Sequence, residues 1–206
     1  MSDQQTGEGP TRCGYVALVG APNAGKSTLL NQLVGAKIAI VTPKVQTTRT
    51  RVTAIAIEAN SQIIFVDTPG IFKPSRRLEK AMVDAAWGGA EDADRIVLII
   101  DAAKGITADV ERIIAGLEKN GRRAHVILNK IDILKRDSLL ALAQSLSERG
   151  IFDEIYMISA LTGDGVADLR AALAEEMPEG PWLYPEDQLA IAPMRQLAAE
   201  VTREKL

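Results

Sequence analysis

The sequence has little of what marks secreted or membrane-spanning proteins. Cys13 is the only cysteine among 206 residues, which excludes an internal disulfide framework and fits a reducing compartment. No apolar run approaches the roughly 18 residues of a membrane-spanning helix. The opening MSDQQTGEGPTRCG is polar and lacks the apolar core of a signal peptide. We therefore expect a cytoplasmic protein.

An excess of one charge is also missing. The 24 basic and 27 acidic residues leave a formal net charge of −3, so the composition as a whole indicates neither a nucleic acid nor an anionic membrane as partner. Histidine occurs once, at His125 inside an expected strand, and we expect it to be structural and not a catalytic base. A hydrophobic content of 47% suits one globular domain with a short addition.

Short apolar runs alternate with longer amphipathic ones, which predicts an α/β fold. Continuous apolar runs are typical of strands buried on both faces of a parallel sheet. The expected strands are Tyr15–Val19, Val52–Ile57, Ile63–Val66, Arg95–Ile100, His125–Leu128 and Ile155–Ile158. The expected helices are Lys26–Val34, Leu78–Ala90, Asp109–Lys119, Ser138–Arg149 and Val166–Glu176.

Only EANSQ separates the second and third strands. This is too short for a crossover helix, so the pair should form an antiparallel hairpin at one edge of the sheet. We therefore predict a doubly wound, mostly parallel sheet of these six strands with one antiparallel edge strand. In such folds, ligands bind beyond the carboxyl ends of the strands.

The composition along the sequence predicts three segments. Residues 1–13 are expected to be a flexible tail and residues 14–177 a globular domain. Residues 178–206 begin as a proline-rich linker and continue into an amphipathic helix. The apolar stripe of that helix has nothing after it to cover it, so we expect the start of a truncated second domain.

The first expected strand leads into GAPNAGKST, which matches the phosphate-binding pattern G-x-x-x-x-G-K-[ST] of P-loop NTPases. Glycines let the backbone wrap around phosphate oxygens, and N–H groups at a helix N-terminus supply positive potential. Lys26 can reach the β- and γ-phosphates, and the Ser27 hydroxyl can ligate magnesium. The expected phosphate-binding residues are Gly20, Ala21, Pro22, Asn23, Ala24, Gly25, Lys26, Ser27 and Thr28.

The motif Asp67-Thr68-Pro69-Gly70 ends the third expected strand. It lies at the same end of the sheet as the phosphate loop. Asp67 can hold magnesium through water, and the Gly70 N–H can sense a γ-phosphate. Taken alone, an aspartate at the end of a strand is equally compatible with a cap of the next helix.

The motif Asn129-Lys130-Ile131-Asp132 follows the fifth expected strand and indicates a guanine base. The Asp132 carboxylate can accept hydrogen bonds from the ring N–H and the exocyclic amine of guanine. Adenine lacks this pair of donors, and a site that leaves buried polar groups unpaired rejects the wrong base. The Lys130 stem can lie over the base, and Asn129 can brace the neighbouring loops.

A weaker motif, Ser159-Ala160-Leu161, follows the last expected strand. There a backbone N–H, that of Ala160, can bond the guanine oxygen. The motif supports a guanine site by its position and not by its composition.

The phosphate loop, DTPG, NKID and SAL in this order resemble those of the translation-factor-related GTPases. More narrowly, GAPNAGKSTLLNQLVG, VQTTRTR, VDTPGI and EGPWLYPEDQ resemble the Era-type GTPases, roughly from Tyr15 to the end of the chain. The resemblance implies a magnesium-dependent switch that hydrolyses GTP and acts in small ribosomal subunit assembly (16S rRNA maturation). It implies rRNA binding through a KH domain, of which residues 178–206 hold only the linker and the first helix. A peripheral membrane association fits the same family, and we expect a monomer.

The resemblance also implies a switch loop in AKIAIVTPKVQTTRTR, between the first helix and the hairpin. Family members place the threonine that joins magnesium directly before an arginine. That residue is Thr48 here, with Thr47 as the alternative.

One departure concerns hydrolysis. Ras-type GTPases place a water-orienting glutamine after the D-x-x-G glycine, where this sequence has Ile71, so unaided turnover should be slow. Related GTPases with the same PNxGKS loop hold a potassium ion with the asparagine oxygen, which implies this role for Asn23. A bond that closes the turn is the alternative for Asn23. The expected catalytic residues are Lys26, Thr48, Gly70 and Asn23.

Two other functions are alternatives to a GTPase switch. One is an RNA- or ribosome-binding module in which the nucleotide is mainly a structural ligand. The other, an ATP-dependent phosphotransferase, is disfavoured by Asp132.

Overall fold

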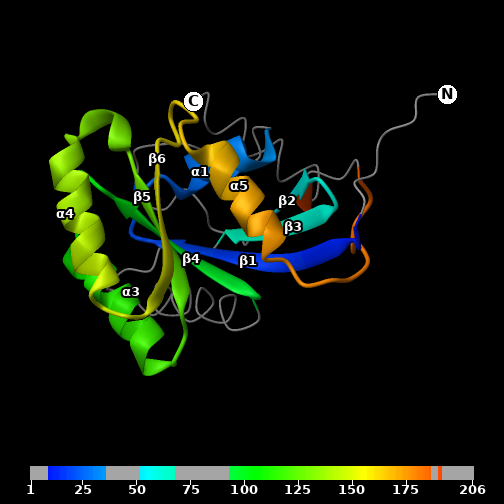
Figure 1. Cartoon of the computed structure of the whole chain (residues 1–206), viewed down its shortest axis with the longest axis horizontal. Coiled ribbons are helices and arrows are strands. Elements are labelled where there is room, and N and C mark those ends of the chain that lie inside the picture. The colour runs from blue at the N-terminus through cyan, green and yellow to red at the C-terminus, as the bar shows by residue number, and fades with distance from the viewer. Residues whose placement is uncertain (1–8, 36–51, 68–92, 187–189, 192–206) are drawn as a thin grey trace.

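The computed structural model describes residues 9–35, 52–67, 93–186 and 190–191, and these form a sheet with helices on both faces (Figure 1). The strand order of the seven-stranded sheet is β6-β5-β4-β1-β3-β2-β7. The strands are β1 (Arg12–Gly20), β2 (Val52–Glu58), β3 (Ser61–Asp67), β4 (Arg95–Asp101), β5 (Ala124–Asn129), β6 (Phe152–Ile158) and β7 (Ala190–Ile191). The helices are α1 (Lys26–Val34), α3 (Ala108–Lys119), α4 (Arg136–Ser147) and α5 (Val166–Glu175), with a short 3-10 turn η1 (Ile131–Ile133).

The predicted mostly parallel α/β sheet is confirmed. β1 pairs in parallel with β3 and β4, β4 with β5, and β5 with β6. β2 runs antiparallel to β3, and the two residues Ala59 and Asn60 separate them. The short β7 pairs antiparallel with β2 and so lies outside it, which makes β7 and not β2 the outermost strand on that side. Two residues are too few to give a strand pattern, so the sequence did not indicate β7.

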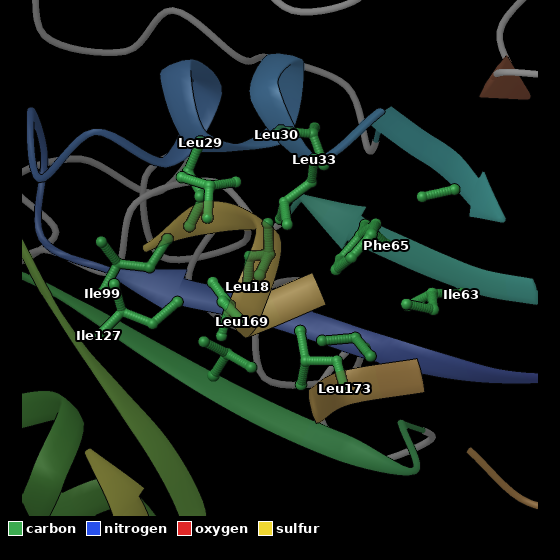
Figure 2. Packing of buried hydrophobic residues seen from close by; sticks show 14 of the residues in the cluster. Leu18, Leu29, Leu30, Leu33, Ile63, Phe65, Ile99, Ile127, Leu169 and Leu173 are labelled. Carbon is green, nitrogen blue, oxygen red and sulfur yellow. The ribbon is translucent and has the colours of Figure 1, made fainter. Parts of the chain in front are cut away.

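Each central strand is apolar along its length because both of its faces are covered. Val16 and Leu18 of β1 pack in one core cluster, while Ala17 and Val19 pack in the other. The first cluster lies under α1 and α5, and Figure 2 shows Leu18 among the side chains of that face. The second lies under α3 and α4. Period-two side-chain alternation on a fully covered sheet therefore explains the continuous apolar runs.

The expected tail over residues 1–13 needs a correction, because β1 begins at Arg12 and includes Cys13. Their side chains interrupt the apolar run, but their backbone groups pair with Ser61 and Gln62 of β3. The Cys13 N–H also donates to the Pro178 carbonyl at 3.0 Å. The sequence pattern depends on side chains, whereas the start of β1 is set by backbone pairing with β3.

The linker after α5 is bound to the sheet over its described part. The buried Gln62 side chain accepts hydrogen bonds from the N–H groups of Leu183 (2.9 Å) and Tyr184 (3.0 Å) and donates to the Tyr184 carbonyl. The Trp182 indole donates to the Asn60 carbonyl at 3.0 Å. These hydrogen bonds therefore hold the linker against the β2–β3 hairpin.

Two expected helices, Leu78–Ala90 and the amphipathic helix that follows the proline-rich linker, lie outside the described residues. Within the described part of the chain, no helix is long and apolar enough to cross a membrane.

Candidate functional site

The loop between β1 and α1 lies at the carboxyl end of the sheet, where the loops after β4, β5 and β6 also begin. Its backbone takes left-handed conformations at Asn23 (φ 62°) and Gly25 (φ 102°). Gly25 is the N-cap of α1, and no described side chain caps that helix. The first N–H groups of α1 therefore face the loop, as an anion site at a helix N-terminus requires.

The Lys26 ammonium lies over the same loop. It donates to the carbonyl oxygens of Gly20 (2.9 Å) and Ala21 (3.1 Å). Ser27 follows in the first turn of α1 and is half-buried. Within a few residues, the loop and the start of α1 thus contain the Lys26 ammonium, the Ser27 hydroxyl and backbone N–H groups.

Asn129 joins three loops that lie far apart in the sequence. It is the last residue of β5 and 2% exposed, and its amide nitrogen donates to the Ala24 carbonyl at 2.8 Å. Its amide oxygen accepts from the Ala160 N–H at 2.9 Å. A Cβ on Gly25 would stand 2.1 Å from the Asn129 amide nitrogen, so glycine is required there by this close approach as well as by its φ.

In the structure the Ala160 N–H, predicted to bond the guanine oxygen, has an acceptor within the protein. Instead of being directed at a base alone, it bonds Asn129. A bond to the guanine oxygen would need this donor to be shared. The sequence did not reveal the Asn129 oxygen as a competing acceptor because the two residues lie on separate loops.

The Asp132 carboxylate is oriented by Ser159. Asp132 lies in η1 and is exposed, and its Oδ1 accepts from the fully buried Ser159 hydroxyl at 2.6 Å. The Ser159 oxygen in turn accepts from the Thr162 N–H at 3.2 Å. Leu161 of the same loop is 75% exposed. A carboxylate offers about four acceptor sites, so the bond from Ser159 leaves room for two donors of a base.

Lys130 connects the loop Asn129–Asp132, called the base loop below, to the phosphate loop and to Asp101. It adopts a left-handed conformation (φ 70°), and its ammonium donates to the Asn23 carbonyl at 3.0 Å and to Asp101 Oδ2 at 2.7 Å. Sequence reasoning missed Asp101. The available signal was a carboxylate at the end of the apolar run RIVLIID, the same kind of position that Asp67 and Asn129 occupy on their strands.

The structure describes only part of the residues that were expected to contact magnesium and the γ-phosphate. Asp67 ends β3 and is in register with Leu18 of β1, two residues before the phosphate loop, but its side chain lies outside the description. Thr47, Thr48, Gly70 and Ile71 lie outside the described residues as well. Among the residues that are described, no three His, Cys, Asp or Glu side chains form a metal-binding cluster. Magnesium at a nucleotide needs no such cluster, because phosphate and water oxygens complete its shell.

His125 lies at the amino end of β5, away from this site. Its Nε2 is 2.8 Å from Glu176 Oε2, and its ring meets that of Tyr156 edge-on. Burial raises the pKa of Glu176, but hydrogen bonds from Arg95 and His125 outweigh this and hold the pKa below its usual value. This arrangement fits a structural histidine.

Comparison with known proteins agrees with this geometry. Residues 15–130 match the family described as 50S ribosome-binding GTPase. The chain is 57% identical to the GTPase Era of Afipia carboxidovorans over 197 residues, which are 96% of this chain and 64% of that protein. It is 58% identical to the GTPase Era of Mesorhizobium japonicum, covering 100% of this chain and 67% of that protein.

A solved structure gives the same result in three dimensions. The crystal structure of Era in complex with MgGDPNP and nucleotides 1506–1542 of 16S ribosomal RNA is 42% identical to this chain, with a TM-score of 0.88. The match covers 95% of this chain and 67% of that one. The chain thus spans about two thirds of the length of the curated relatives that it matches. Sequence, fold and the arrangement of the loops together place this chain in the Era family of GTPases.

Proposed function

We propose that this chain binds GTP and hydrolyses it slowly to GDP and phosphate, as a molecular switch. The observation that carries the proposal is the bond network between the loop with Asp132 and the phosphate loop. Asn129 and Lys130 each donate to a carbonyl of the phosphate loop, so both halves of the site are fixed relative to each other. One ligand with a guanine base and phosphates satisfies both halves.

Base recognition rests on Asp132. With Oδ1 held by Ser159, the carboxylate keeps one orientation, and the lone pairs that remain can accept the ring N–H and the amine of guanine. An adenine would leave this acceptor without donors. The selectivity therefore favours GTP over ATP.

Phosphate binding rests on the loop from Gly20 to Thr28. Its N–H groups and the start of α1 stabilise negative charge, and Lys26 exchanges its two carbonyl contacts for phosphate oxygens. Ser27, Thr48 and Asp67 are the residues that would hold magnesium, which neutralises charge on the β- and γ-phosphates. The proposal is supported by the position of Ser27 in the first turn of α1 and by the register of Asp67 with Leu18, two residues before the loop.

The switch itself is assigned to the segments around Thr48 and Gly70. Contacts of these residues with the γ-phosphate order them in the GTP state, and loss of the phosphate releases them. Since Ile71 replaces the glutamine that orients water in Ras-type GTPases, we expect slow turnover. The output is a changed surface for a partner and not a released product.

For the partner we propose the small ribosomal subunit and its 16S rRNA, in a cytoplasmic assembly step. The support is the related Era structure, which holds nucleotides 1506–1542 of 16S ribosomal RNA. The description of the matching family names the 50S ribosome instead of the small subunit. We follow the Era structure because its match covers 95% of this chain, whereas the family model matches residues 15–130.

The first test is the variant Lys26→Ala. Loss of a charged hydrogen-bond partner costs about 1.5–3 kcal/mol, so GTP affinity should fall roughly ten- to a hundredfold while the fold is retained. Fluorescent nucleotide titration, circular dichroism and phosphate release measure this. Lys119→Ala, at the exposed end of α3, serves as the matched control.

Two outcomes would contradict the proposal. If Lys26→Ala binds and hydrolyses GTP like the parent, the ammonium has no role with phosphate. If the parent binds 16S rRNA tightly but has no magnesium-dependent turnover, the chain is an RNA-binding module in which nucleotide is a structural ligand.

A second test concerns Asn23, for which we propose a potassium ion bound to the side-chain oxygen. Its side chain is exposed, and within the described residues it makes no hydrogen bond that closes the turn. A cation there stabilises charge that develops between the β- and γ-phosphates. GTP turnover should be several-fold faster in potassium chloride than in equal sodium chloride, and Asn23→Ala should abolish this difference while GDP affinity stays similar. Equal parental rates in both salts would exclude the ion.

A further inference from the structure

We propose that Asp101 is a positioning residue for the nucleotide base, acting through Lys130. It fixes the lysine so that the stem lies along the base and the ammonium ties the base loop to the phosphate loop. This inference rests on the proposed binding of guanine nucleotide.

Asp101 is itself held in place. It is the last residue of β4 and is 7% exposed. Its Oδ1 accepts from the Ala103 N–H at 3.1 Å, while its Oδ2 accepts from the Lys130 ammonium at 2.7 Å. In the sheet it is in register with Asn129, the residue before Lys130. The carboxylate thus presents one oxygen to the lysine from a rigid strand end.

Lys130 needs such a partner. Lysine has a flexible stem and loses considerable rotamer freedom when it is fixed. Its backbone is held in the left-handed region (φ 70°), but among the described residues the ammonium has two acceptors, Asp101 Oδ2 and the Asn23 carbonyl. Without the charged acceptor, the ammonium would keep one neutral carbonyl and otherwise bind water. The stem would then no longer be held in one rotamer.

A second cation near Asp101 provides a control. The Lys104 ammonium is 3.8 Å from the same Oδ2, and its side chain is 57% exposed, against 34% for Lys130 and 8% for Asp101. An ion pair with an exposed lysine at this distance contributes little. The close bond to Lys130 therefore carries the effect that we assign to Asp101.

A purely structural role in the turn after β4 is the alternative. The Lys104 and Gly105 N–H groups bond the Asp101 backbone carbonyl, and the side chain adds the bond from Ala103. Asp101→Asn keeps the size of the side chain and an oxygen for Ala103 but removes the charge that faces Lys130. This substitution therefore separates the two roles.

The experiment measures GDP dissociation by stopped flow for the parent, Asp101→Asn, Lys130→Met and the double variant, with Lys104→Ala as control. We expect dissociation about tenfold faster in Asp101→Asn, no further acceleration when it is combined with Lys130→Met, and the parental rate in Lys104→Ala. The thermal midpoint of the nucleotide-free protein should stay at the parental value. Asp101→Glu, which keeps the charge, should restore most of the slow dissociation.

Additive effects of Asp101→Asn and Lys130→Met would overturn the proposal, because residues that act through each other couple in such a cycle. An unchanged dissociation rate in Asp101→Asn would also overturn it. If instead the parent protein fails to bind GDP, the proposed function fails and the positioning role with it, which is a different result. A fall in the nucleotide-free thermal midpoint of Asp101→Asn that Asp101→Glu does not reverse would assign the residue to the turn alone.

Discussion

The substitution Asp132→Asn should change the base preference of this protein from guanine to xanthine. The amide can accept one base proton but presents a donor where guanine also has a donor. Because two donors that face each other cannot pair, GTP affinity should fall on the order of a hundredfold or more. Xanthosine triphosphate has an acceptor in place of the amine, so its affinity should rise. Competition of both nucleotides with a fluorescent GDP analogue measures the exchange.

Asp137→Asn is the matched control for this substitution. Asp137 is an exposed acid in the first turn of α4, a short distance along the chain from η1. It removes the same charge without touching the loop held by Ser159. Unchanged GTP and xanthosine triphosphate affinities in Asp132→Asn would remove the guanine-binding role from the NKID motif.

Gly25→Ala should nearly abolish nucleotide binding. An added Cβ would stand 2.1 Å from the Asn129 amide nitrogen, and φ is 102° at this position. Asn129 would have to leave both the Ala24 carbonyl and the Ala160 N–H, which separates the base loop from the phosphate loop. We expect a loss of GTP affinity on the order of a hundredfold, as for several broken hydrogen bonds, and a fold destabilised by about 1–3 kcal/mol from backbone strain.

Gly35→Ala separates strain from contact. Gly35 at the end of α1 also has a positive φ, of 71°, but no atom of the described residues lies within 4 Å of an added Cβ. It should cost stability through its backbone while leaving GTP affinity at the parental value. Urea unfolding and nucleotide titration on both variants give the comparison. Parental GTP affinity in Gly25→Ala would show that the close approach to Asn129 is not needed for binding.

The sequence by itself determined the type and order of the strands β1 to β6 and of the helices α1, α3, α4 and α5. The run Arg95–Ile100 reads as a strand buried on both faces, and the structure has β4 there with a core cluster on each side. EANSQ is too short for a crossover, and β2 and β3 form the expected hairpin. These features follow from side-chain periodicity and chain length, which are local properties. The phosphate loop could also be predicted from the sequence, because its glycines and Lys26 lie close together along the chain.

Only the tertiary structure decided how the loops of the site are tied together. The Asn129 bond to Ala24 joins residues 105 positions apart, and the Lys130 bond to Asp101 joins two strand ends. Neither leaves a periodic trace, because each depends on the order of strands in the sheet and on the neighbours that this order creates. The same holds for Ala160, whose N–H bonds Asn129, and for the start of β1 at Arg12, which pairs with β3 through backbone groups. Local pattern specifies which residues form an element, whereas packing specifies which groups meet between elements.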